Sequence, residues 1–167
     1  MSTMTEPREL LLHDMGDLLF AEQTLVKALP KLASEATDNE LKSGFESHLT
    51  ETKQHVDNLK AAFEAIGEEP KAEKCPGIEG IKKEHDEFMS NEEPSPELCN
   101  LFLTGAGTRA EHYEIAAYEG LITLAEGLGE TQIMPLLQEN LEQEKAALQK
   151  LKTAAKRLSK ATASISR

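Results

Sequence analysis

The sequence contains no tryptophan, and aromatic residues make up only 4% of its 167 positions. Cysteine is almost as rare, because Cys75 and Cys99 are the whole complement. They lie far apart in the sequence and form no CxxC motif. We therefore expect two free thiols, with a disulfide between them as the less favoured alternative.

An excess of positive charge is also missing. The chain has 18 basic and 30 acidic residues, a formal net charge of −12. This balance argues against nucleic acid and against an anionic membrane surface as partners. No apolar run approaches the roughly 18 residues of a membrane-spanning helix, and Met1–Arg8 has no signal-peptide core. We expect a cytoplasmic protein that binds neither membrane nor nucleic acid.

Leu, Ala, Glu and Lys dominate the sequence, a composition typical of long helices. The length suggests one domain, 1–167, with a core over about 7–158 and frayed ends that include Ser159–Arg167. Four long segments show helical periodicity: 7–35, 38–66, 96 to about 127–129, and 131 to about 158. Thr37 and Glu40 have the spacing of a capping box at the second segment.

The lengths of the connections predict how these helices are arranged. The first and second helices, and the third and fourth, are joined by a few residues and should form antiparallel hairpins. The link between the hairpins is near thirty residues, long enough to cross a bundle and return, and Ile78 to Phe88 suggests a short fifth helix within it. The pattern predicts an all-α fold, a ferritin-like four-helix bundle of two hairpins joined by a long crossover.

Three of the long helices place a glutamate in the middle of an apolar face. These residues are Glu22, Glu111 and Glu144. Burying an unpaired carboxylate costs several kcal/mol or more, and no Lys or Arg occupies the centre of these faces. Because ions of charge +2 or +3 would neutralise converging carboxylates, metal binding is the favoured explanation. Glu114, one turn from Glu111, could bridge or terminate such a site.

The second helix offers a mixed set of candidates. His48, Glu51 and His55 stand at i, i+3 and i+7, so all three can address one site. Imidazole with carboxylate suits iron, manganese or zinc. Either histidine could instead be a hydrogen-bonded core residue, and the sequence leaves that alternative open. His13 and His85 are expected to be solvated.

The segments around these residues resemble a known family. Ala21-Glu22-Gln23, His48-Leu-Thr-Glu51-Thr52, Glu111-His112-Tyr113-Glu114-Ile115-Ala116 and Leu141-Glu-Gln-Glu144-Lys145 look like the YciE/YciF family of bacterial ferritin-like proteins. The resemblance covers about Glu9 to Leu158 and extends more distantly to rubrerythrins and bacterioferritins. It implies a homodimer, a stress response, and two transition-metal ions per chain, with iron or manganese favoured over zinc.

One departure from the wider pattern affects the expected chemistry. Di-iron proteins of this class place a histidine three residues after the glutamate on the second and fourth helices. Here those positions are Gln54 and Ala147. This departure weakens the expectation of efficient redox catalysis more than that of metal binding.

Two classes of function follow. The first is a di-metal oxidoreductase that oxidises Fe(II), removes peroxide or acts like a catalase, with peroxide or oxygen as the small oxidant. The second is a non-catalytic homodimeric stress protein whose metals are structural or vestigial.

Overall fold

The computed structural model describes residues 3–165, with side chains through residue 164. This part of the chain is helical and contains no strand. Its elements are α1 (Pro7–Glu35), α2 (Asn39–Ala65), α3 (Pro76–Asn91), α4 (Pro96–Leu128), the short 3-10 helix η1 (Thr131–Ile133) and α5 (Met134–Ile165). The predicted all-α fold with a fifth helix in the crossover is confirmed.

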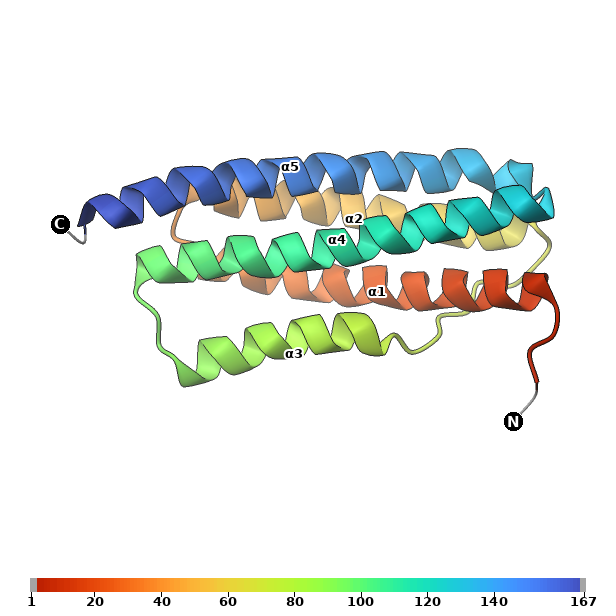
Figure 1. The fold of residues 1–167 in the computed structure, drawn as a ribbon, viewed down its shortest axis with the longest axis horizontal. Coiled ribbons are helices and arrows are strands. Elements are labelled where there is room, and N and C mark those ends of the chain that lie inside the picture. Colours follow the sequence, from red (N-terminus) through yellow and green to blue (C-terminus); the bar gives the residue numbers. More distant parts are fainter. Residues whose placement is uncertain (1–2, 166–167) are drawn as a thin grey trace.

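The helices form two antiparallel hairpins, α1 with α2 and α4 with α5 (Figure 1). The hairpins pack through α1 against α4 and α2 against α5. Helix α3 lies outside the bundle against α1 and α4. The crossover runs the length of the bundle once and does not return, so α4 starts at the end opposite to the one where α2 finishes.

The start of α2 and the end of α5 are among the helix ends that differ from the predicted ones. Asp38, not Thr37, caps α2, because its carboxylate accepts a hydrogen bond from the Leu41 backbone N–H at 2.9 Å. Helix α5 continues to Ile165, so the predicted fraying from Ser159 is wrong up to that residue. Residues 166 and 167, like 1 and 2 of the predicted domain, lie outside the described part.

The apolar core is divided into two clusters along the bundle axis. One cluster includes Leu18, Leu59 and Leu137, and the other includes Leu29, Leu103 and Leu151. On α1, α2 and α5 the buried acidic and imidazole side chains fall between the two clusters, and on α4 they fall near the boundary. The fold therefore encloses a polar layer at mid-height of an otherwise apolar interior.

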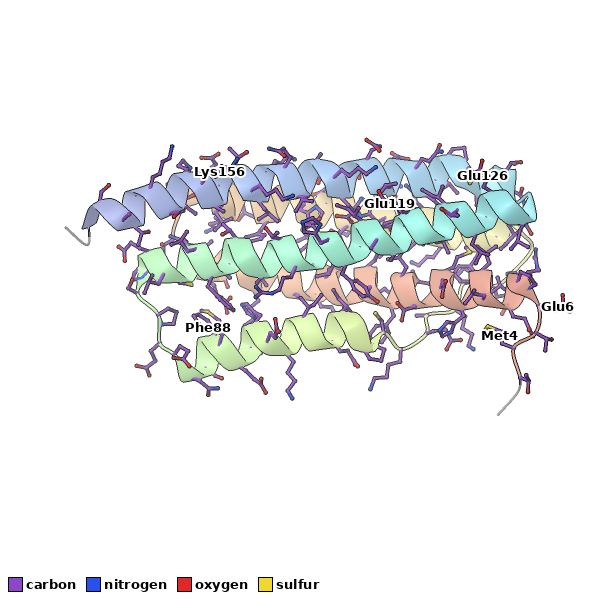
Figure 2. The ribbon with its side chains drawn as sticks, in the orientation of Figure 1. Met4, Glu6, Phe88, Glu119, Glu126 and Lys156 are labelled. Carbon is purple, nitrogen blue, oxygen red and sulfur yellow. The ribbon has the colours of Figure 1, made fainter. Side chains whose placement is uncertain are left out.

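The outer surface carries most of the charge. Glu119, Glu126 and Lys156 project away from α4 and α5 into solvent (Figure 2). Between residues 3 and 165, no helix is both long and apolar enough to cross a membrane. Cys75 and Cys99 are buried free thiols, as expected.

His85 is buried, so the expectation that it is solvated is wrong. Only 4% of its surface is exposed, and its ring stacks on Phe102 with ring centroids 6.0 Å apart. Its Nε2 lies 2.7 Å from a carboxylate oxygen of Glu35. The imidazole thus ties α3 to the end of α1, a tertiary contact that helical periodicity does not predict.

Replacing His85 by alanine should loosen α3. The variant His85→Ala loses a buried hydrogen bond and an aromatic stack, so we expect its free energy of unfolding to fall by about 1–2 kcal/mol. The exposed His13 provides the control, since His13→Ala should change stability by less than about 0.5 kcal/mol. Urea unfolding measures both values. Equal stability of the two variants would contradict the anchoring role of His85.

Candidate metal centre

Four helices bring the predicted ligands to the polar layer. Glu22 comes from α1, and Glu144 comes from α5. Helix α2 supplies His48, Glu51 and His55, and α4 supplies Glu111 and Glu114. Apart from Glu51, all of these residues are buried.

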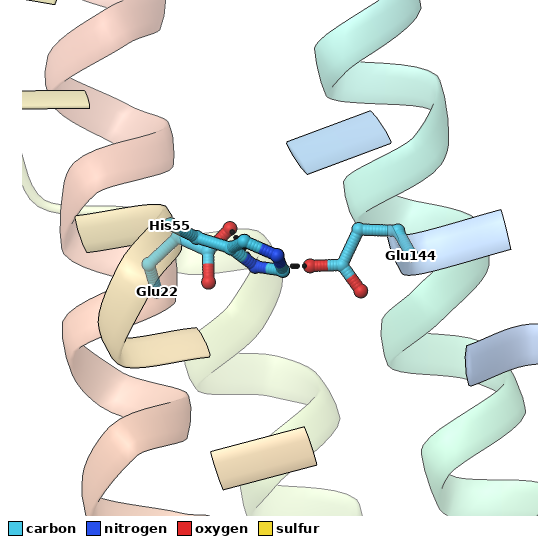
Figure 3. A group of neighbouring side chains, drawn as sticks. All are labelled: Glu22, His55 and Glu144. Atoms are coloured by element: carbon cyan, nitrogen blue, oxygen red, sulfur yellow. Dashed lines mark ion pairs between the residues drawn. The ribbon is translucent and has the colours of Figure 1, made fainter. Parts of the chain in front are cut away.

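One group of three consists of Glu22, His55 and Glu144 (Figure 3). His55 lies between the two carboxylates, with Nδ1 3.3 Å from Glu22 Oε1 and 2.9 Å from Glu144 Oε1. None of the three side chains is accessible to solvent. The donor atoms lie within 4.8 Å of one another, close enough to bind a single ion.

A second group shares Glu144 with the first. His48 Nε2 lies 3.3 Å from Glu111 Oε1 and 3.5 Å from Glu144 Oε2. Glu144 therefore presents one oxygen to each group. The centroids of the His48 and His55 rings are 6.2 Å apart, so each imidazole serves its own group. A carboxylate shared between two histidine-containing groups suits a pair of ions about 3.5–4 Å apart.

The structure brings neither Glu51 nor Glu114 into these groups of three. The Glu51 side chain is 28% exposed, and its carboxylate lies 3.1 Å from His48 Nδ1 and 3.7 Å from Lys150 Nζ. Glu114 is fully buried beside the layer, and neither of its oxygens has a hydrogen-bond partner. Ligand roles for both residues stay predictions.

Unpartnered polar atoms provide the test of whether these residues suit a metal. Among the described residues, seven buried side-chain nitrogen and oxygen atoms have no hydrogen-bond partner. They are Glu22 Oε2, His55 Nδ1, Glu111 Oε2, both oxygens of Glu114 and both oxygens of Glu144. His55 Nδ1 is near two carboxylates, but the geometry does not direct a hydrogen bond to either. Every unsatisfied atom belongs to a predicted ligand, and each is a donor type that iron, manganese and zinc accept.

A network of neutral polar side chains supports the first group. The Tyr118 hydroxyl donates a hydrogen bond to Glu22 Oε1 and accepts one from Asn140 Nδ2 at 2.9 Å. Asn58 Nδ2 donates to Asn140 Oδ1 at 2.8 Å. Neither asparagine is among the site residues predicted from the sequence. Like the glutamates, each asparagine is a polar residue on an apolar helical face. A neutral amide on such a face is a weaker indication of a site than a carboxylate, because burying it costs less free energy.

Electrostatics at the site follow from burial. Loss of hydration raises the pKa of Glu22, and raises the pKa values of Glu111 and Glu114 well above the usual range. Burial also acts on Glu144, but contacts with His55 and Glu111 outweigh it and lower its pKa. Although burial opposes the charged imidazole, the flanking carboxylates of Glu144 and Glu22 raise the pKa of His55 to about 10. Without metal, the layer holds protons in place of cations.

Two cavities reach the layer from the surface. The larger, about 280 Å³, opens between α2 and α5 and ends at His48 and Glu111. The smaller, about 120 Å³, lies beneath α3 and reaches the same two residues. Its outer wall includes Asp86, which pairs with Lys31 at 2.7 Å and with Lys82. Both cavities therefore reach the second group, and the larger one offers more space beside it.

Comparison with known proteins places the chain within one family. The family model described as "Domain of unknown function (DUF892)" matches residues 6–164. Protein YciF of Escherichia coli strain K12 is 36% identical over 139 residues, which cover 83% of each chain. These matches agree with the resemblance that the helix motifs suggested.

Solved structures show the same arrangement. The crystal structure of the E. coli stress protein YciF matches with a TM-score of 0.88 and 34% identity, covering 94% of this chain and 99% of that one. YcfI of Rhodopseudomonas palustris matches with a TM-score of 0.87 and 40% identity, covering 89% and 94%. A Xanthomonas campestris protein, 20% identical with a TM-score of 0.74 and covering 96% and 99%, shares the fold.

The stability of the metal-free protein should decrease as pH rises from about 6 to about 9. Unfolded glutamates have already released their protons below this range, near pH 4.5, and an unfolded histidine does so near pH 6.5. Raised pKa values keep protons on folded Glu22, Glu111, Glu114 and His55, so the folded state binds more protons than the unfolded state. Thermal unfolding of protein treated with a chelator measures the effect. Added Zn²⁺ should reverse the slope, because the ion replaces those protons. Metal-free stability that stays constant across this range would contradict the assignment of protons to the layer.

Replacing Glu22 by alanine should lower metal content sharply while the helical fold remains. The variant Glu22→Ala removes a ligand of the first group and also relieves repulsion among buried carboxylates, so the metal-free Tm should stay level or rise. Glu126→Ala, at an exposed position on α4, is the matched control and should keep its metal. Metal analysis and circular dichroism measure both properties. Unfolding of Glu22→Ala with unchanged metal content would show that Glu22 is not a ligand.

Proposed function

The chain belongs to the DUF892 family, and we propose that it binds two transition-metal ions in the polar layer of its ferritin-like bundle. The observation that carries the proposal is the set of seven buried nitrogen and oxygen atoms without hydrogen-bond partners. Leaving such atoms unsatisfied in an apolar interior is strongly unfavourable. Multivalent cations would satisfy all of the carboxylates at once.

Each group of three would hold one ion. Glu22 and His55 would hold the first, His48 and Glu111 would hold the second, and Glu144, which presents one oxygen to each group, would serve both. Glu114 would be a further ligand within the layer, and Glu51 would be a further ligand at its edge. Mixed imidazole and carboxylate donors favour iron or manganese, with zinc as the alternative.

The surrounding residues would set the geometry and the proton balance. Tyr118 holds Glu22 by one oxygen and leaves the other free to face an ion. Glu111 and Glu114, whose pKa values are raised, would release protons as metal binds. When bound, a pair of iron or manganese ions would supply two electrons, enough to convert one hydrogen peroxide and two protons to two waters.

A role in stress protection accords with this chemistry. The E. coli relative is called a stress protein, and we extend that role to this chain. The small oxidant would be peroxide or oxygen, reaching the layer through a surface cavity. A non-catalytic role is the second candidate, supported by the missing histidine at Ala147 and by the provisional description of the R. palustris relative as a structural protein.

Metal analysis of variants tests whether His48 and His55 bind different ions. Protein loaded with Fe(II) or Mn(II) should contain about two ions per chain, and His55→Ala and His48→Ala should each retain about one, since each imidazole belongs to a different group. His13→Ala is the matched control and should keep both ions. Wild-type protein that stays metal-free after loading would overturn the proposal.

Peroxide consumption distinguishes the two candidate roles. A redox protein loaded with two ions should consume peroxide catalytically, either by oxidising a second peroxide to oxygen or, when a reductant such as ascorbate is added, by taking the two electrons from that reductant. Either histidine variant should lose most of that activity. Full metal content without turnover would favour the structural role. The homodimer implied by the family resemblance stays a prediction, and sedimentation equilibrium tests it against the 18.4 kDa mass of one chain.

A further inference from the structure

The larger cavity has features that metal entry alone does not require. It is open to solvent on one side and has a volume of about 280 Å³ between α2 and α5. An engineered apolar cavity of about 150 Å³ holds benzene, so this space suits a molecule of roughly ten non-hydrogen atoms. Oxygen and hydrogen peroxide, with two oxygen atoms each, would leave most of it empty.

The walls of the cavity are mainly apolar. Leu41 and Phe45 line it from α2, and Ala147, Leu151 and Ala154 line it from α5. At its inner end are His48 and Glu111, which are 7% and 4% exposed. Glu111 Oε2 has no hydrogen-bond partner. A ligand with an apolar body and a hydrogen-bonding head would satisfy both parts of this surface.

Charge around the cavity disfavours an anionic head. Glu40 and Glu51 line it with a single lysine, Lys150, whose Nζ lies 3.7 Å from Glu51 Oε1. A carboxylate or phosphate ligand would meet more negative than positive charge and no free lysine. A neutral hydroxyl or hydroperoxyl head avoids that repulsion and can still hydrogen-bond to Glu111.

Gly44 indicates that the mouth of the cavity is kept open. It lies inside α2, where glycine is less favourable than alanine by about 1 kcal/mol. Its backbone needs no glycine, because φ is not positive and a Cβ added there would meet nothing within 4 Å. The residue is exposed and lines the cavity. A side chain at position 44 would therefore occupy space at the entrance of the cavity.

We propose that the cavity between α2 and α5 binds a neutral small molecule with an apolar body and one hydroxyl or hydroperoxyl head, and that Gly44 keeps its entrance open. The head lies beside His48 and Glu111, and the body lies along Phe45 and Leu151. The inference goes beyond metal binding, because the cavity and its lining exist without an ion. It adds a ligand class to the layer that the two groups of three define.

The probe is 2-phenyl-2-propanol, a neutral alcohol with ten non-hydrogen atoms. Titration into the full-length protein, both metal-free and Zn²⁺-loaded, should shift the amide NMR signals of Gly44, Phe45 and Leu151 saturably, with a Kd of roughly 0.1–1 mM. In the metal-free protein, the anion 2-phenylpropanoate, similar in size and shape, should bind at least about tenfold more weakly than the alcohol. Unsaturable or scattered shifts would overturn the proposal.

Gly44→Leu fills the entrance and should weaken binding of the alcohol at least about tenfold, while the Tm rises because leucine favours a helix. Gly120→Leu, at an exposed glycine inside α4 whose added Cβ also meets nothing, is the matched control and should bind normally. Equal binding by both variants would overturn the role of Gly44. If neither the wild-type protein nor Gly44→Leu binds the alcohol, and Gly44→Leu converts a wild-type dimer to monomers, the proposal is overturned. This face would then be a contact between chains.

Metal content, measured on the same samples, keeps this inference separate from the proposed function. Gly44→Leu should retain about two ions per chain, since no predicted ligand changes. Binding of the alcohol by a protein that takes up no metal would leave the cavity site standing and remove the metal proposal. Metal uptake without binding of the alcohol would remove the cavity site and leave the metal proposal standing.

Discussion

Buried carboxylate oxygens without hydrogen-bond partners are the constraint around which this protein is organised. Glu22, Glu111, Glu114 and Glu144 lie within the bundle, where hydration cannot stabilise their charge. Such a layer tolerates either protons or cations. The raised pKa values of Glu22, Glu111 and Glu114 correspond to the layer that holds protons. The position of Glu144 between His48 and His55 indicates how the layer would instead hold cations.

The rest of the fold supports that layer from both sides. An apolar cluster above and another below bury enough surface to hold the four long helices together despite the polar layer between them. The long crossover leaves the two hairpins free to face each other, so that each contributes carboxylates at the same height. Tyr118, Asn140 and Asn58 then fix the Glu22 side of the layer through hydrogen bonds between helices.

Much of this arrangement was predictable from sequence because it depends on helical periodicity. The bounds of α1 and the start of α4 agree with the predicted segments, and the three glutamates central to their faces are all buried. Contacts between helices were not predictable in the same way. The burial of His85 depends on Glu35 and Phe102, and the partly exposed Glu51 lies near Lys150 of α5. No spacing rule encodes either contact.

Membership of the DUF892 family accounts for the fold, while the chemistry depends on the side chains of this chain. Anomalous diffraction from crystals grown with Mn(II) would locate each bound ion independently of activity. We expect two peaks in the polar layer, one between Glu22, His55 and Glu144 and the other between His48, Glu111 and Glu144. Fully loaded crystals whose peaks lie only on the outer surface, with the layer empty, would contradict this expectation.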